Sequence, residues 1–172
     1  MDWQPTLEGR LVRLRPLREE DFESLYAVAR DPLIWEQHPA HDRYREEVLR
    51  GFFRDAIHSG GALAAEDLKD GRVIGSSRFH GYDPEQSEVE IGWTFLARSH
   101  WGGAFNGEMK RLMLAHAFRF VRSVVLLVGP ENLRSQKAVE KIGGVRDGTR
   151  LDGSGRENIL YRIRAADFNP TR

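Results

Sequence analysis

The sequence predicts a single domain of mixed α/β class, and three observations support this prediction. The chain has 172 residues, which is the usual length of one domain. Short runs of alternating apolar and polar residues, typical of strands, are interspersed with longer runs that have helical apolar spacing. The order strand, helix, strand over residues 88–128 predicts two parallel neighbouring strands, because antiparallel neighbours need no long crossover.

The elements follow in order along the chain. Residues 11–15 alternate and stop at Pro16, and residues 62–95 hold three strands joined by short turns, which predicts antiparallel pairing. The continuous apolar run 124–128 predicts an interior strand. Strands are therefore expected over 11–15, 62–68, 73–79, 88–95, 124–128, 145–151 and 157–163, and helices over 19–29, 45–57, 105–120 and 132–142. Together they predict one domain over 1–172 with a mostly antiparallel sheet of about 6–7 strands and helices on both faces.

Composition excludes several classes of protein. The 26 basic and 26 acidic residues give zero net charge, which is not typical of a duplex nucleic-acid-binding protein. The chain has no cysteine, so disulfides, thiolate metal sites and cysteine nucleophiles are excluded. No apolar run is long enough to span a membrane and the N-terminus does not resemble a signal peptide, so a cytoplasmic location is expected. The histidines lack metal-ligand spacing, and no metal is expected.

The stretch from Glu88 to Phe120 is the most informative part of the sequence. It combines an acidic alternating strand, a glycine-rich turn with Gly102, Gly103 and Gly107, and a long amphipathic helix. Free N–H groups and the positive end of the helix dipole make such a turn a natural anion site. A phosphate-bearing ligand would then lie close to a carboxylate that could act as a general base, which favours an enzyme.

Four segments in this order give the chain a family resemblance. They are residues 11–17 with Asp21, 89–93, 101–108 and 132–144. The chain resembles the GNAT superfamily of acyl-CoA-dependent N-acetyltransferases, most closely the branch with the ribosomal-protein N-terminal acetyltransferases. The resemblance covers nearly the whole chain. It implies that the fourth and fifth predicted strands are parallel and splay apart around acetyl-CoA.

The resemblance also implies a reaction and its partners. An acetyl group would pass from acetyl-CoA to a primary amine, on a small molecule or a protein N-terminus, by direct attack through a tetrahedral intermediate. The partners would be acetyl-CoA, as co-substrate, and the amine acceptor, with no nucleic acid, no membrane and no metal; a homodimer is left open. The residues placed on the coenzyme are Trp93, Thr94, Phe95, Trp101, Gly102, Gly103, Ala104, Phe105, Asn106, Gly107, Asn132, Arg134, Ser135 and Lys137.

Two residues are expected to carry the chemistry. Glu90 is the first candidate for the base that deprotonates the amine, with Glu88 in reserve, and a solvated carboxylate is the competing interpretation. If Glu90 has this role, Glu90→Gln is expected to lower turnover most at low pH. Ser135 is the candidate acid for the departing thiolate, because Val139 occupies the position where many family members have tyrosine. A first-turn serine bonded to the backbone is equally consistent.

Other residues keep two interpretations. Asn132 suits a coenzyme contact and a helix N-cap, and Arg134 and Lys137 suit the 3′-phosphate or a solvated helix face. His116 is expected in the core, and His100 could touch phosphate. The segments of Trp35, His38 and Tyr82 line the acceptor pocket in this family, although aromatic packing also explains these residues.

Three departures from the family pattern, Ala104, Asn106 and Val139, keep an alternative function open. This is a non-catalytic acyl-CoA-binding or regulatory module with the same fold. A nucleotide loop of a kinase or dehydrogenase is disfavoured, because the chain has no lysine-bearing P-loop and no dinucleotide glycine pattern.

Overall fold

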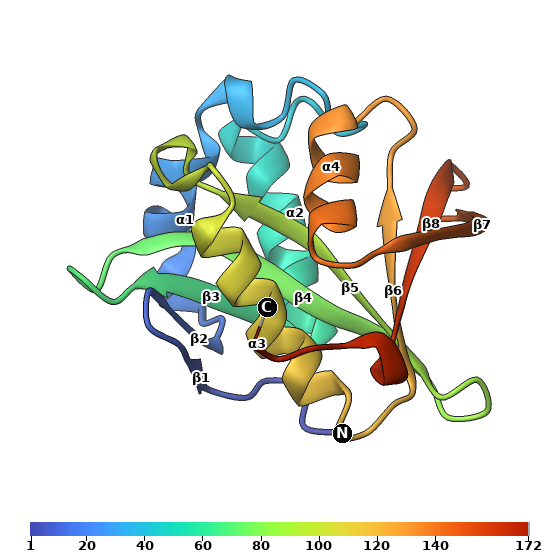
Figure 1. The fold of residues 1–172 in the computed structure, drawn as a ribbon. Coiled ribbons are helices and arrows are strands. Elements are labelled where there is room, and N and C mark those ends of the chain that lie inside the picture. Colours follow the sequence, from blue (N-terminus) through green and yellow to red (C-terminus); the bar gives the residue numbers. More distant parts are fainter. Residues whose placement is uncertain (172) are drawn as a thin grey trace.

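A computed structural model describes residues 1–171, and one mixed sheet organises the chain (Figure 1). Its eight strands run in the order β1-β2-β3-β4-β5-β6-β8-β7. The strands are β1 (Leu7–Glu8), β2 (Val12–Pro16), β3 (Ala62–Asp67), β4 (Val73–Asp83), β5 (Glu88–Leu96), β6 (Ser123–Val128), β7 (Val145–Leu151) and β8 (Glu157–Arg164). The α-helices are α1 (Phe22–Ala29), α2 (Glu46–Ser59), α3 (Ala104–Ala117) and α4 (Leu133–Lys141). Four short 3₁₀ turns are η1 (Glu19–Asp21), η2 (Pro32–Ile34), η3 (Arg98–His100) and η4 (Ala165–Asp167).

The predicted architecture is confirmed with one more strand than expected. All seven predicted strands are present, and the additional strand, β1, has only two residues, too few for a periodic pattern. Within residues 1–171 only β5 and β6 pair in parallel, and the other strand pairs are antiparallel. The strand–helix–strand pattern therefore identified the single parallel pair correctly.

Helices cover both faces of the sheet, as predicted, and each face has its own apolar core (Figure 1). The first core joins Met109 and Met113 of α3 to residues of β2, β3, β4, β5, β6 and β8, including Val124 of β6 and Tyr161 of β8. The second joins α1 and α2 to the opposite face and includes Phe52 and Phe95. The helical spacing seen in the sequence thus separates two layers around one sheet.

The ends of α3 and α4 follow local rules. Gly103 precedes α3 with φ 101°, a left-handed conformation that favours glycine. The helix ends at Ala117 rather than at Phe120, and residues 118–120 form a turn. Asn132 caps α4, since its side-chain oxygen accepts a hydrogen bond from the Ser135 N–H at 3.2 Å.

No helix among residues 1–171 is long and apolar enough to cross a membrane.

Candidate active site

A cleft of about 870 Å³ opens where β5 and β6 separate. The two strands pair only over Glu88–Glu90 and Ser123–Val125, and beyond these residues their backbones are no longer bonded to each other. The cleft is lined by the second half of β5, the glycine-rich loop before α3, the start of α4 and the β7–β8 turn. Unpaired backbone groups at such a fork are free to bind a ligand.

A bulge in β5 lies at the centre of this cleft. The register with β4 changes between Ser76↔Phe95 and Arg78↔Gly92, so that Trp93 and Thr94 together oppose Ser77. Trp93 has φ 52°, a strained conformation for a bulky residue. Bulges re-aim groups beside active sites. This bulge places Trp93, Thr94 and Phe95, three of the residues predicted to contact the coenzyme, on the cleft.

Glu90 lies at the fork, on the last residue pair that joins β5 to β6. Its side chain is half-buried and lines the cleft. Burial raises the pKa of Glu90 to about 7, although Arg150 and Arg78 favour the charged form. A carboxyl group with this pKa exchanges protons readily near neutral pH, as a general base requires.

Glu88 has a different role. Its carboxylate accepts hydrogen bonds from Arg150 at 2.9 Å and from Arg162 at 2.6 Å. Burial opposes its ionisation, but these two arginines outweigh burial and lower the pKa of Glu88. Glu88 thus ties β5 to the β7–β8 hairpin and does not line the cleft, which leaves Glu90 as the candidate base.

The glycine-rich loop lies at the other end of the cleft. Gly102 and Gly103 have φ values of 114° and 101° and line the cleft with Asn106 and Gly107. A Cβ atom on Gly103 would come within 2.5 Å of the Lys141 Nζ. The ammonium of Lys141, at the end of α4, therefore lies directly against the backbone at the N-terminus of α3. Both features favour an anion there.

Lys141 lines the cleft, although the sequence did not single it out, whereas the predicted coenzyme residue Lys137 does not. Lys137 is exposed, lies one helical turn before Lys141 on α4, and does not line the cleft. Ala104 and Phe105 also lie off the cleft. Phe105 instead packs against His100, with ring centroids 4.7 Å apart. The helical spacing between residues 137 and 141 could have raised both lysines as candidates.

The first turn of α4 contributes Asn132 and Ser135 to the cleft. The Ser135 backbone N–H binds the capping Asn132, whereas its hydroxyl has no hydrogen-bond partner within residues 1–171. The alternative of a serine bonded to the backbone through its hydroxyl is therefore not what the structure shows. Val139 is buried and apolar, so no acid occupies that position.

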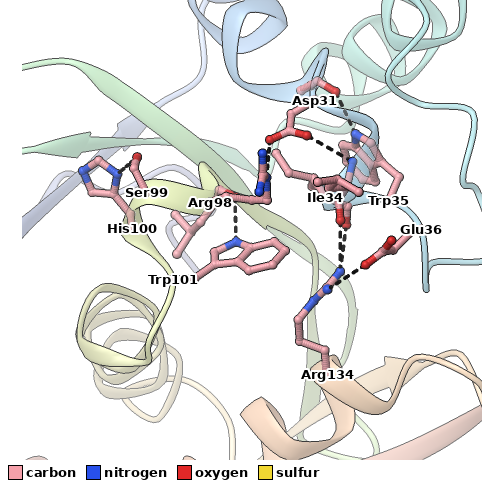
Figure 2. A network of polar contacts seen from close by, with 12 residues as sticks. Asp31, Ile34, Trp35, Glu36, Arg98, Ser99, His100, Trp101 and Arg134 are labelled. Atoms are coloured by element: carbon pink, nitrogen blue, oxygen red, sulfur yellow. Dashed lines mark hydrogen bonds and ion pairs between the residues drawn. The ribbon is translucent and has the colours of Figure 1, made fainter.

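Arg134 joins α4 to the opposite rim of the cleft (Figure 2). Its guanidinium lies over the Trp101 ring, 4.2 Å from the centroid, and contacts the Ile34 carbonyl at 3.3 Å and Glu36 at 3.6 Å. The Trp101 indole N–H donates to the Leu96 carbonyl at 3.0 Å. Arg134 does line the cleft, but its charge is already engaged within the protein.

Lys110 is a second residue that the sequence analysis missed. It lies on the buried side of α3, is 4% exposed, and still reaches the cleft. Its ammonium donates hydrogen bonds to the hydroxyls of Thr94 and, at 3.4 Å, Ser77. Burial lowers the pKa of Lys110 to about 7. A lysine inside an apolar helical seam is the signal that could have identified it.

The remaining predicted residues divide between core and pocket. His116 is buried and its Nε2 bonds the Asp2 carbonyl at 2.7 Å, which confirms a core histidine. His100 borders the cleft, but its two ring nitrogens contact Ser99 and Asp67, each at 2.8 Å. Trp35 and His38 line the cleft, whereas Tyr82 packs on Trp3 away from it.

Residues 1–171 contain no group of three or more potential metal-ligating side chains placed to hold a metal ion.

This fold, with a glycine-rich loop and a fork between two parallel strands, is the fold of a known acetyltransferase family. The sequence model of the acetyltransferase (GNAT) domain family matches residues 11–145. The chain belongs to this family, and it is an acetyltransferase by that membership. No curated protein sequence matches it closely enough to add a more specific activity.

Solved structures share the fold. A GCN5-related N-acetyltransferase from Brucella melitensis has a TM-score of 0.79 at 21% identity, covering 95% of this chain and 80% of its own. Mycobacterium smegmatis RimJ in complex with CoA-disulfide has a TM-score of 0.71 at 22% identity, covering 96% and 90%. Spermidine N-acetyltransferase from Vibrio cholerae, in complex with CoA and spermine, has a TM-score of 0.68 at 18% identity, covering 92% and 98%. At these identities the similarity shows the common fold.

Proposed function

We propose that this chain transfers the acetyl group of acetyl-CoA to the nitrogen of a primary amine, with Glu90 as general base. The position of Glu90 carries the proposal: it lies at the strand fork, in the same cleft as the glycine-rich loop, with its pKa raised to about 7. The loop and Lys141 suit the coenzyme phosphates, and the fork beyond Glu90 suits the thioester arm.

The residues support each step of such a transfer. An alkylammonium, of pKa ~10.4, gives a proton to the Glu90 carboxylate directly or through a water. The amine nitrogen then bonds to the thioester carbonyl carbon, and N–H groups of the β5 bulge are candidates to stabilise the oxyanion. As the oxyanion re-forms the carbonyl group and the C–S bond breaks, the nitrogen loses its extra proton to water. The departing thiolate takes up a proton from water, either directly or through the Ser135 hydroxyl, which water reprotonates.

The direct test is release of free thiol from acetyl-CoA across a panel of primary amines, with mass detection of the acetylated amine. We expect turnover with at least one amine and a roughly hundredfold lower rate in Glu90→Gln. Glu85→Gln, which removes an exposed carboxylate outside the cleft, serves as the control and should match the wild-type rate. Equal rates in the two variants would remove Glu90 from the role of base.

Coenzyme binding has its own test. Lys141→Gln should weaken CoA binding by roughly ten- to hundredfold, because a charge-assisted contact to phosphate is lost beside Gly103. Lys137→Gln is the matched control on the same helix and should bind CoA as the wild type does. Isothermal titration calorimetry measures both variants, and equal affinities would contradict the assignment of Lys141.

The alternative of a non-catalytic acyl-CoA-binding module is supported by Val139, which leaves the usual acid position apolar. It predicts tight CoA binding with no thiol release for any amine. The same two measurements therefore separate the alternatives.

A further inference from the structure

Two neighbouring arginines, Arg43 and Arg78, form no ion pair with a carboxylate within residues 1–171. Arg78, on β4, is 6% exposed, and its Nε and Nη2 atoms have no hydrogen-bond partner within residues 1–171. Arg43 precedes α2, lines the cleft, and forms no ion pair with the described part of the chain. Buried polar groups are nearly always paired, so these two cations require an explanation.

The two groups share one aromatic wall. The guanidinium carbon of Arg43 lies 4.5 Å from the Phe52 ring centroid, and that of Arg78 lies 5.6 Å from the same centroid. Arg78 also lies over the Trp93 ring at 4.5 Å, directly behind the bulge that forms the cleft. Arg43 therefore faces the ligand space, and Arg78 reinforces the positive charge from behind the aromatic rings.

The surrounding groups compensate little of this charge, because the exposed Asp42 favours the charged form of Arg43 without forming an ion pair with it. Burial and repulsion from Arg78 and Arg156 lower the pKa of Arg43 to about 10, so it remains charged at neutral pH. Burial and repulsion from Arg43 and Arg156 lower the pKa of His38 to about 4, so this imidazole is neutral. Asp152 accepts hydrogen bonds from Ser154 and Asn158 and lies 3.8 Å from Arg156. Among residues 1–171, the carboxyl groups that favour the charged form of Arg78 are those of Asp55 and the partly protonated Glu90.

A positive pocket next to a general base selects the chemistry of the acceptor. It repels a second ammonium group, as a polyamine would bring, and it favours the neutral form of the reacting amine. It attracts a carboxylate, for which a guanidinium offers matching donors.

We propose that the acceptor carries a carboxylate close to its primary amine, as an amino acid does, and that Arg43 binds this carboxylate with Arg78 in support. The proposal rests on the proposed N-acetyltransferase function and specifies its substrate class. The carboxylate of the acceptor is only bound and does not react, so the chemistry remains the acetylation of the amine described above.

The test compares amino acids with their decarboxylated amines, such as phenylalanine with phenethylamine and lysine with cadaverine, together with spermidine. We expect kcat/KM to be roughly ten- to hundredfold higher for the amino acid of at least one pair than for its amine. Comparable or faster turnover of the decarboxylated amines or of spermidine would overturn the proposal while leaving the N-acetyltransferase function intact.

Variants locate the effect. Arg43→Gln should abolish the preference for the amino acid over its decarboxylated amine, mainly through KM, and Arg43→Lys should retain part of this preference. Arg54→Gln changes an arginine on the exposed side of α2 and should leave the preference unchanged. A preference that persists in a folded Arg43→Gln protein would overturn the assignment of Arg43. If no amine is acetylated, the proposed function fails. Calorimetry then measures amino-acid binding separately from catalysis. The proposed carboxylate site would be overturned if no amino acid binds, or if Arg43→Gln leaves the affinity unchanged.

Discussion

At the scale of single residues, burial decides the ionisation of Glu90. Arg78 on β4 and Arg150 on β7 favour its charged form, whereas Glu88 and Asp152 oppose it, and burial outweighs the arginines. The carboxylate is therefore the minor form below pH of about 7 and the major form above it. A general base works only in its deprotonated form.

The expected loss in Glu90→Gln is consequently largest above pH 7. Wild-type turnover should rise as pH increases through about 7, and the variant should lack this rise. This reverses the expectation from the sequence that the loss is greatest at low pH, because the sequence does not show how deeply the carboxylate is buried. Rate–pH profiles of both proteins measure the effect. If the ratio of wild-type to variant turnover stayed constant from about pH 5.5 to about pH 8.5, the role of Glu90 as a base with a pKa of about 7 would be contradicted.

Burial lowers the pKa of Lys110, whereas it raises that of Glu90. Since the folded protein holds this ammonium in a buried site with a pKa of about 7, protonation there costs stability. The hydroxyls of Ser77 and Thr94 also bond each other at 2.8 Å, so they keep a partner without the lysine.

Lys110→Met should therefore raise the free energy of unfolding near neutral pH by roughly 1–3 kcal/mol. Above pH 7 the unfolded chain binds a proton that the folded chain does not, so wild-type stability rises toward pH ~10.4 and the advantage of the variant shrinks. Urea unfolding of both proteins at pH 7 and pH ~10 measures this. A variant that is less stable at both pH values would contradict it.

At the scale of elements, Glu108 connects the long helix to the edge of the sheet. Its carboxylate accepts hydrogen bonds from the backbone N–H groups of Arg10, Leu11 and Val12 at 2.8, 2.7 and 2.8 Å. A Cβ atom on Gly9 would lie 2.5 Å from the Glu108 carboxyl carbon, so this turn requires glycine. The turn between β1 and β2 thus uses the first part of α3 as its hydrogen-bond acceptor.

Glu108→Gln should destabilise the protein by roughly 2–3 kcal/mol, because an amide NH₂ would face N–H groups that need an acceptor. Chemical denaturation measures the loss, with Glu85→Gln as an exposed control expected to change stability by less than about 0.5 kcal/mol. An unchanged unfolding midpoint in Glu108→Gln would show that water replaces the carboxylate at this turn.

At the scale of the whole molecule, the parting of β5 and β6 divides the sheet into two halves that share a ligand cleft. The halves remain joined by the short parallel pairing at Glu88–Glu90 and by the ion pairs of Glu88 with Arg150 and Arg162. A ligand in the fork would contact both halves, and it stabilises the folded state by mass action.

Hydrogen exchange should report this directly. We expect the amides of Trp93 and Thr94 to exchange faster in the free protein than those of Val89 and Glu90, since the bulge leaves the former outside the paired register. Acetyl-CoA at about 100 times its Kd should slow exchange at the bulge and add about 2.7 kcal/mol of stability. Protection that appears only on β1 and β2, remote from the cleft, would contradict binding in the fork.

The sequence by itself determined the fold class, the parallel pair, the glycine-rich loop and the position of Glu90, because each depends on local periodicity or on the order of neighbouring elements. The tertiary structure alone decided the roles of Glu88, Lys141, Lys110 and the Arg43–Arg78 pair. Their environments come from side chains far away in the chain: Glu88 meets arginines of the C-terminal hairpin, and Lys141 reaches back to Gly103. Burial and charge pairing act through space, and for that reason local sequence patterns could not assign these roles.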